Sequence, residues 1–272
     1  MRKCAYCAFY SRPLAADLHE AWRRGIHRDL AELPEGFRPE TVFLGGGTPT
    51  VLGEADLSRW LETLRENVDM GEVVEWTCEV NPGTLTKEKA RVLREAGVNR
   101  LSVGAQSFDD GMLKRLGRVH TAEETRECVA LSREAGFANV GLDLMYGVPG
   151  MSLEGLKADV DALLALEPEH VSCYCLELEA GTPFTRTMAR ERIQIDEDGQ
   201  RAQFDGLRQR LAGAGYRHYE ISNFARPGRE CRHNGLYWCG GDYIGIGPSA
   251  HSHWRGVRWG HTAELPDWGR EF

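Results

Sequence analysis

Short apolar runs alternate along the chain with longer amphipathic segments. The runs are partly β-branched and resemble strands buried on both faces. They predict five strands, at Thr41–Gly45, Val73–Val80, Asn99–Gly104, Asn139–Met145 and His170–Leu176. Helical periodicity predicts helices near Asp17–Leu33, Glu54–Asn67, Lys87–Ala96, Glu123–Ala135, Leu153–Leu166 and Gln200–Ala214. This alternation indicates an α/β fold.

Glycines mark the ends of three predicted helices. Gly97, Gly136 and Gly215 each precede a predicted strand, the last of which covers His218–Phe224. Glycine can end a helix in the left-handed conformation and turn the chain into a strand. Repeated strand–helix units need right-handed crossovers and give a parallel sheet. We therefore expect a full or partial (β/α) barrel rather than an open doubly wound sheet.

The last part of the chain has a different character. From Arg226 onward it is rich in Gly, Trp and His, and its periodicity is weak. We expect a loop-rich segment that covers one end of the sheet or begins a second domain. The predicted domains are therefore residues 1–225, the barrel core, and residues 226–272.

Composition narrows the class of protein. The chain has 33 Lys and Arg against 41 Asp and Glu, a net charge of −8, which is poorly suited to binding nucleic acid. It has no apolar run long enough to span a membrane and no apolar stretch behind its first residues, so we expect a cytoplasmic protein, with peripheral membrane contact left open. Eight cysteines in such a protein are typical of thiols or metal ligands rather than disulfides.

The first cysteines form the pair Cys4-Ala5-Tyr6-Cys7. Alone, this pair fits a redox couple, half of a zinc site or no function. With the following residues through Ser11, it resembles the end of the C-x-x-x-C-x-x-C motif of the radical S-adenosylmethionine (radical SAM) family. There, three thiolates hold a [4Fe–4S] cluster, and its fourth iron binds S-adenosylmethionine. The resemblance makes Cys4 and Cys7 the metal ligands.

The match to this motif is incomplete at the start of the chain. The first cysteine would fall one residue before Met1, and the family's first barrel strand would precede it. We expect that the chain starts late and, as written, supplies two of the three thiolates. It also stops at Phe272, earlier than the family usually does, so we expect truncation at both ends.

Further motifs follow the predicted strands. Gly45-Gly46-Gly47-Thr48-Pro49 resembles the GGGTP motif that contacts the methionine part of the cofactor, which implicates Gly46, Gly47 and Thr48. Glu79 follows the next strand, where the family places a carboxylate on S-adenosylmethionine. Taken alone, the glycine segment is better explained as a plain turn, and the alternative for Glu79 is a solvated acid at a strand end before an Asn-Pro turn.

Three more polar residues match family motifs further along. They are Gln106 in G-x-Q-S-F, Arg118 in G-R-x-H and Asp143 in D-L-M-Y-G-V-P, and the resemblance implies that each contacts S-adenosylmethionine. The alternatives are a surface amide, a surface cation and a capping acid. Their succession at strand ends favours the functional interpretation. The resemblance, from Cys4 to about Trp238, implies a partial (β/α)6-type radical SAM barrel with parallel strands.

Two clues bear on the branch of the family. The coproporphyrinogen dehydrogenase branch resembles C-x-x-x-C-x-x-C-x-C, whereas this chain has Phe9 at the last position, as the HemW haem chaperone branch does. The segment His233-Asn234-Gly235-Leu236-Tyr237-Trp238 resembles the haem-associated H-N-x-x-Y-W motif. Imidazole is a common iron ligand, and aromatic rings suit a porphyrin face. The alternative is a core cluster in which His233 satisfies backbone groups.

The resemblance therefore implies a HemW-like protein with a [4Fe–4S] cluster, S-adenosylmethionine and haem, which passes haem to an acceptor protein. His233 is the expected haem ligand. A second hypothesis is an oxygen-independent coproporphyrinogen III dehydrogenase of porphyrin biosynthesis, which decarboxylates its substrate through a 5′-deoxyadenosyl radical. A third is an inactive fragment.

Overall fold

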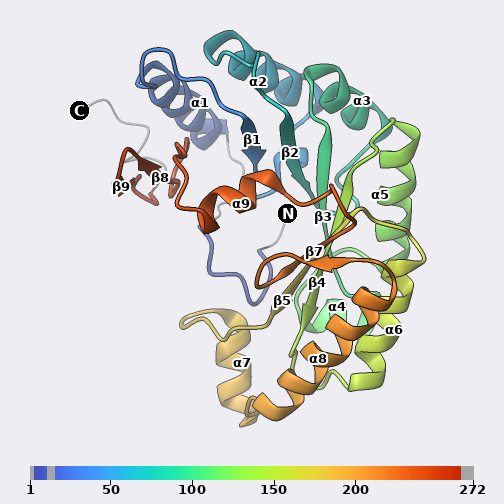
Figure 1. Cartoon of the computed structure of the whole chain (residues 1–272). Helices are drawn as coiled ribbons and strands as arrows, with labels where there is room; N and C mark the ends of the chain where they lie inside the picture. The colour runs from blue at the N-terminus through green and yellow to red at the C-terminus, as the bar shows by residue number, and fades with distance from the viewer. Residues whose placement is uncertain (1–2, 11–15, 265–272) are drawn as a thin grey trace.

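A curved seven-stranded sheet forms the centre of the protein (Figure 1). The computed structural model describes residues 3–10 and 16–264. The strands follow the order β1-β2-β3-β4-β5-β7-β6. Their bounds are β1 (Thr41–Leu44), β2 (Glu75–Val80), β3 (Arg100–Gln106), β4 (Val140–Tyr146), β5 (His170–Cys175), β6 (Arg217–His218) and β7 (Asn223–Ala225).

Strands β1 to β5 are parallel to their neighbours, as the alternation of the sequence predicts. The five predicted strands are confirmed to within two residues at each end. The register aligns Thr41 of β1 with Glu75 of β2, and Gly141 of β4 with His170 of β5. The carboxyl ends of these five strands therefore meet at one edge of the sheet.

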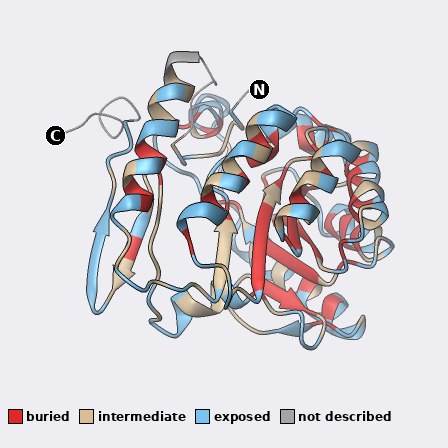
Figure 2. Ribbon diagram, turned by 90° about the horizontal axis from the view of Figure 1, so that it is seen from above, coloured by how far each residue is buried: buried red, intermediate tan, exposed pale blue. Residues whose placement is uncertain are grey.

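Helices cover the outer face of this sheet (Figure 1). They are α1 (Ala16–Ala31), α2 (Glu54–Asn67), α3 (Lys87–Ala96), α5 (Ala122–Glu134), α6 (Leu153–Leu164) and α8 (Glu197–Gly213). Helices α4 (Asp110–Arg115) and α7 (Pro183–Glu191) lie at the carboxyl ends of the strands, where Phe184 of α7 and Leu116, the residue after α4, form backbone hydrogen bonds with Ala5. Figure 2 shows most of the central strands buried and the outward faces of the helices exposed. Leucines from both layers, such as Leu61, Leu93 and Leu142, are fully buried between them, and this burial is the main stabilising contribution.

The helix boundaries follow local signals in the sequence. The Thr86 side chain accepts a hydrogen bond from the Lys89 backbone at the start of α3, and Thr121 begins α5 with a capping box. Gly97, Gly136 and Gly215 have positive φ angles of 111°, 84° and 88°. The prediction that these glycines end helices in the left-handed conformation is therefore confirmed.

The expectation of parallel strands throughout was wrong for the far edge of the sheet. The predicted strand His218–Phe224 is two short strands, β6 and β7, that pair antiparallel. Only four residues join them, and a connection that short can only reverse the chain, because a parallel pair needs a long crossover. Strand β7 also runs antiparallel to β5, with Asn223 opposite Ser172.

The segment after Arg226 contains more regular structure than its sequence predicts. It forms α9 (Arg232–Trp238) and a hairpin of β8 (His251–Trp254) and β9 (Val257–Gly260). Arg255 and Gly256 have φ angles of 49° and 79°, and the two-residue hairpin turn needs such positive values. Helix α9 crosses the concave side of the sheet (Figure 1). The domain boundary at residue 225 stays a prediction.

Within residues 3–10 and 16–264, no helix is long and apolar enough to cross a membrane.

Candidate cofactor site at the carboxyl ends of the strands

Polar side chains line the inner face of the sheet, opposite the helices. On β2, Trp76, Cys78 and Val80 are buried in the core, whereas Glu79 lies on the other face. The same alternation places Asp143 of β4 on the inner face, because successive side chains of a strand point to opposite sides. The two carboxyl groups therefore share the concave side of the sheet near the carboxyl ends of their strands.

Burial raises the pKa of both carboxyl groups. Burial, together with the nearby Asp143, raises the pKa of Glu79 to about 8, against a small opposing effect of the Gly46 N–H. Burial also raises the pKa of Asp143, while hydrogen bonds from Ser172 and Ser102 oppose this rise. Arg100 and Arg118 offset the rise only for Asp143, so the pair of acids still favours a cationic ligand beside Glu79.

The glycine-rich turn after β1 contacts this acidic pair. The Gly46 N–H donates to Glu79 Oε2 at 3.1 Å. A Cβ atom on Gly45 would lie 2.6 Å from Glu79 Cδ, so this position admits only glycine while Glu79 keeps its place. A Cβ on Gly47 would meet nothing within 4 Å. The turn thus packs on Glu79 with one glycine and leaves an open, exposed backbone at the next two.

Arg118 joins the separate loops of the site. Its Nη1 lies 3.2 Å from Cys4 Sγ, and its Nη2 donates to the Gly104 carbonyl at 2.7 Å and to the Asn81 side chain. Asn81 in turn donates to Thr48 Oγ1. A single guanidinium therefore connects, directly or through Asn81, the cysteine segment and the ends of β1, β2 and β3. The sequence interpretation missed Asn81, although it lies two residues after Glu79 and thus on the same side of the strand.

The two N-terminal cysteines lie in a turn held at this edge of the sheet. The Cys7 N–H donates to the Cys4 carbonyl at 3.3 Å. The Ala5 N–H donates a hydrogen bond to the Leu116 carbonyl at 3.1 Å, and the Ala5 carbonyl accepts one from the Phe184 N–H at 2.9 Å. Both thiols are partly exposed. The described part of the chain has no group of three or more His, Cys, Asp or Glu that can hold a metal.

Gln106 ends β3 in a strained conformation. Its φ is +66°, which is uncommon for a residue other than glycine, and the register of β3 against β4 shifts between Val103 and Gln106. The Gln106 amide is largely buried at the end of β3. It packs so close to Gly104 that a Cβ atom on that residue would lie 3.2 Å from Gln106 Nε2. Strained residues of this kind cluster at functional sites.

His233 lies at the opposite end of the sheet from these residues. Its Nδ1 is 2.8 Å from Oγ1 of Thr41, the first residue of β1, and its ring stacks on Phe43 with centroids 5.3 Å apart. Its Nε2 is 3.0 Å from the Tyr237 hydroxyl. Burial lowers the pKa of His233. The structure thus brings the other predicted residues to the carboxyl ends of the strands and places His233 at the amino ends.

Glu75 fixes α9 to the start of β2. Its buried carboxylate accepts hydrogen bonds from the backbone N–H groups of Arg232 and His233, at 3.1 and 3.0 Å, and from the Cys231 thiol at 3.4 Å. An acid is favoured there because the N–H groups at the start of a helix carry partial positive charge. Sequence reasoning missed Glu75, although Glu75, Thr77 and Glu79 alternate with apolar residues along β2.

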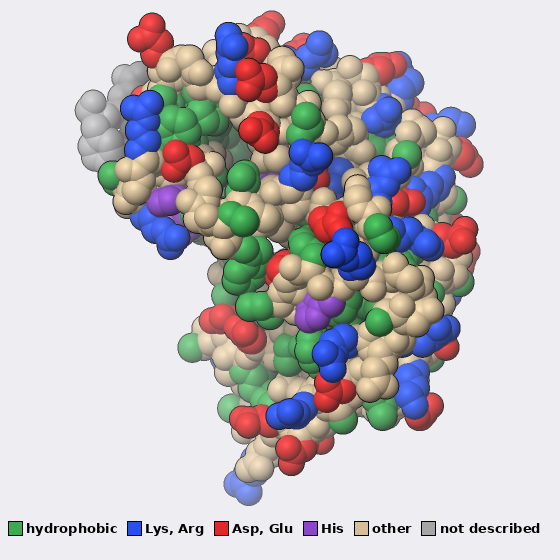
Figure 3. All heavy atoms as spheres, in the orientation of Figure 1, with side chains coloured by type: hydrophobic (Ala, Val, Ile, Leu, Met, Phe, Trp, Pro, Cys, Tyr) green, Lys and Arg blue, Asp and Glu red, His purple; other side chains and the backbone are tan. Residues whose placement is uncertain are grey.

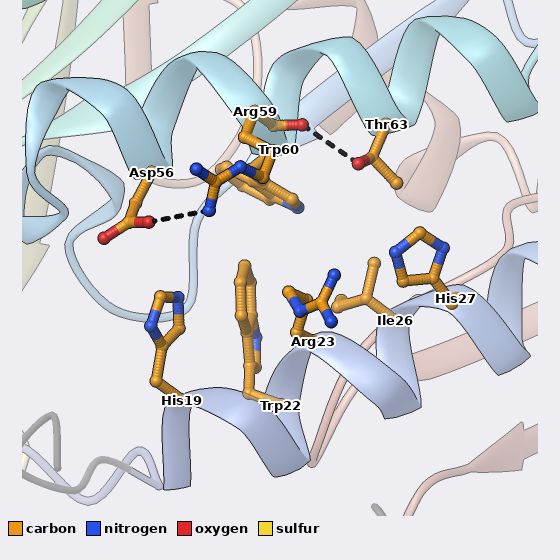
Figure 4. Close-up of a pocket in the computed structure, with 9 residues that line it drawn as sticks. All are labelled: His19, Trp22, Arg23, Ile26, His27, Asp56, Arg59, Trp60 and Thr63. Carbon is orange, nitrogen blue, oxygen red and sulfur yellow. Dashed lines mark hydrogen bonds and ion pairs between the residues drawn. The ribbon is translucent and has the colours of Figure 1, made fainter. Parts of the chain in front are cut away.

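The face of the molecule drawn in Figure 3 has no broad patch of one charge. Figure 3 shows acidic and basic side chains intermixed over the face it presents. A small hollow between α1 and α2, where Trp22 and Trp60 lie beside His19 (Figure 4), has a volume of about 30 Å³. That is about the space of one water molecule, so it is too small for a cofactor.

A parallel sheet with a cysteine turn, a glycine-rich turn and polar groups at its carboxyl ends defines a radical SAM protein. The Radical SAM superfamily model matches residues 1–163. The chain is 36% identical to the heme chaperone HemW of Lactococcus lactis over 94% of its length and 68% of the relative's. It is 38% identical to HemW of Escherichia coli, covering 92% and 67%. The chain belongs to the HemW family.

A solved structure shares this fold. The coproporphyrinogen III oxidase HemN of Escherichia coli, a radical SAM enzyme, superposes with a TM-score of 0.81 at 23% sequence identity. The match covers 97% of this chain and 64% of that chain. At this identity the likeness bears on the fold alone. The chain thus spans about two thirds of the length of these relatives.

Proposed function

We propose that this protein binds S-adenosylmethionine at the carboxyl ends of its strands, binds haem near α9 and passes the haem to an acceptor protein. The Radical SAM superfamily match supports S-adenosylmethionine, and the relatives described as heme chaperones support haem. The observation that carries the haem part is the neutral, partly buried imidazole of His233, which contacts the exposed Tyr237 ring on a helix that also exposes Trp238. A neutral imidazole can ligate iron through Nε2 if that nitrogen gives up its contact with the Tyr237 hydroxyl, while Nδ1 stays on Thr41. The aromatic rings can cover a porphyrin face.

The residues at the carboxyl ends fit S-adenosylmethionine. Its ammonium and sulfonium groups suit the pair Glu79 and Asp143, its carboxylate suits Arg118, and the open backbone of Gly46 and Gly47 admits a close ligand. Thr48 and Gln106 complete the set that we assign to this cofactor. When the cofactor and an iron–sulfur cluster are bound, they supply radical chemistry, and the role of the protein residues is to orient them and keep water away.

Cys4 and Cys7 fit two ligand positions of a [4Fe–4S] cluster. Their thiols are partly exposed on one turn, and Arg118 Nη1 lies 3.2 Å from Cys4 Sγ. The family motif has three cysteines. We expect the 272-residue chain to bind cluster weakly, and a variant with one Cys added directly before Met1 to bind it stably. Iron and sulfide analysis after anaerobic reconstitution measures the difference.

The haem proposal is tested by titrating the protein with hemin and following the Soret absorption. We expect saturable binding that weakens at least tenfold in His233→Ala, because loss of a direct ligand removes more than about 1.4 kcal/mol. His251→Ala, which removes an exposed histidine of β8, is the matched control and should bind like the wild type.

Each outcome of this titration has a definite meaning. Saturable binding that is equal in His233→Ala and wild type would remove His233 from the site. Absence of saturable binding would contradict the chaperone proposal and make coproporphyrinogen III decarboxylation the leading function. The exposed Phe9, at the position where the dehydrogenase branch has a cysteine, favours the chaperone.

A further inference from the structure

A polar cavity of about 320 Å³ lies at the amino ends of β2, β3 and β4. The segments that precede these strands form one wall, and the loop that leads into α9 forms another. Five charged side chains line it, which are Arg94, Arg229, Arg232, Glu75 and Glu230. Three guanidinium groups in one cavity stand out in a chain whose net charge is −8.

The charged groups in this cavity differ in how far they are already engaged. The Glu75 carboxylate accepts the N–H groups at the start of α9, and Glu230 lies 4.0 Å from Arg217. Arg94 donates to the Val98 carbonyl at 2.9 Å. In the part of the chain that the structure describes, the side chains of Arg229 and Arg232 are exposed and form no hydrogen bond or ion pair. Two guanidinium groups are therefore free to bind an anion.

This cavity adjoins the segment that holds His233. Arg232 is its neighbour in α9, and Glu75, which lines the cavity, accepts the His233 backbone N–H at 3.0 Å. The His233 ring lies against β1, whereas the cavity extends to β3 and β4. Two strand spacings, about 10 Å, separate β1 from β3. A ligand that joins the imidazole to the arginines must therefore be broad and carry its negative charge at the rim.

We propose that Arg229 and Arg232 bind the two propionate carboxylates of a haem whose iron is ligated by His233, an inference that rests on the haem-binding function proposed above. Haem has this shape and charge, because its two propionate side chains extend from one edge of a wide, flat ring. The planar guanidinium group can hold a carboxylate through two parallel hydrogen bonds. The cavity thus selects a porphyrin that carries free carboxylates.

The test compares hemin with hemin dimethyl ester, in which both propionates are methylated and uncharged. Arg229→Gln/Arg232→Gln should bind hemin about tenfold more weakly than the wild type and bind the ester equally well. Arg65→Gln/Arg201→Gln is the matched control, because both arginines are exposed and the change in net charge is the same. It should leave both affinities within twofold. His233→Ala should weaken both ligands, and circular dichroism verifies that each variant is folded.

The outcomes separate this inference from the proposed function. Equal hemin affinity in wild type and the Arg229/Arg232 variant would overturn the propionate contact, and so would an equal loss for hemin and its ester. Failure of the wild type to bind hemin would overturn the haem function and this inference with it. A normal affinity in His233→Ala, with the arginine effect retained, would support the propionate contact and overturn only the iron ligand.

Discussion

The surroundings of Glu79 make its ionisation unfavourable in the folded protein. It lies among buried groups, next to Asp143 and against a glycine turn in which a Cβ on Gly45 would collide with it. No lysine or arginine pairs with it in the described part of the chain, and its pKa is raised to about 8. A group that resists ionisation destabilises the protein at neutral pH, and a cationic ligand can reverse that effect.

This raised pKa predicts a pH dependence of stability. The ordinary pKa of 4.5 applies in the unfolded chain and about 8 in the folded one. Between these values the unfolded chain releases a proton that the folded protein retains, so the free energy of unfolding falls as pH rises through this window. Glu79→Gln cannot ionise at this position. Between pH 5 and 8, its free energy of unfolding should therefore fall by about 1–3 kcal/mol less than that of the wild type.

Urea unfolding at several pH values measures this difference. Glu88→Gln, which removes an exposed acid of α3, is the control and should follow the wild type. Parallel curves for Glu79→Gln and wild type would show that Glu79 ionises normally in the folded protein.

At the scale of elements, α9 depends on contacts with the sheet rather than on its own length. It has seven residues, fewer than an isolated helix needs in water. Its start is held by the Glu75 carboxylate, and its His233 side chain contacts Thr41 and Phe43 of β1. The position of the proposed haem ligand is therefore set by one buried acid and one strand.

Replacing this acid should release α9. Glu75→Ala leaves two backbone N–H groups without their charged acceptor, which costs about 1–3 kcal/mol. We expect the Cys231 thiol, only 1% exposed in the wild type, to react with a thiol reagent at least tenfold faster. Peptide mass spectrometry after timed labelling measures the rate.

Two other cysteines serve as internal references. Cys239 is exposed and should react at the same rate in both proteins, whereas Cys128, buried in α5, should stay protected unless the whole domain unfolds. Equal acceleration at Cys128 and Cys231 would mean global destabilisation, and an unchanged Cys231 rate would mean that Glu75 does not hold α9.

At the scale of the whole molecule, the two proposed ligand sites lie at opposite ends of one sheet. The residues assigned to S-adenosylmethionine gather at the carboxyl ends of β1 to β4, and His233 contacts the first residue of β1. Most residues of β2 to β5 between them are buried. The two sites should therefore bind their ligands independently.

Two substitutions test this independence. Asp143→Asn should weaken S-adenosylmethionine binding about tenfold or more, through loss of a buried carboxyl group, and leave hemin affinity within twofold. His233→Ala should do the reverse. Isothermal titration calorimetry of each ligand with each variant gives the four values. A variant that weakens both ligands while its circular dichroism is unchanged would show that the two ends are coupled.

The sequence alone determined the repeating part of the fold and the loops that bear the predicted site. Helices Glu54–Asn67 and Lys87–Ala96 have the predicted bounds, because caps and periodicity are local signals. Since five strands were predicted in parallel order, the motifs at their carboxyl ends were expected at one edge of the sheet, and the structure places Cys4, Glu79, Arg118 and Asp143 there.

Only the tertiary structure decided the rest, because it depends on contacts between segments far apart in the chain. Three contacts join residues that are between about 30 and 160 positions apart. They are the antiparallel pairing of β7 with β5, the hydrogen bonds of Glu75 to the start of α9, and the link from Arg118 through Asn81 to Thr48. No local pattern specifies such pairings. The same reason explains His233, whose motif was recognisable but whose place at the amino end of the sheet came from packing.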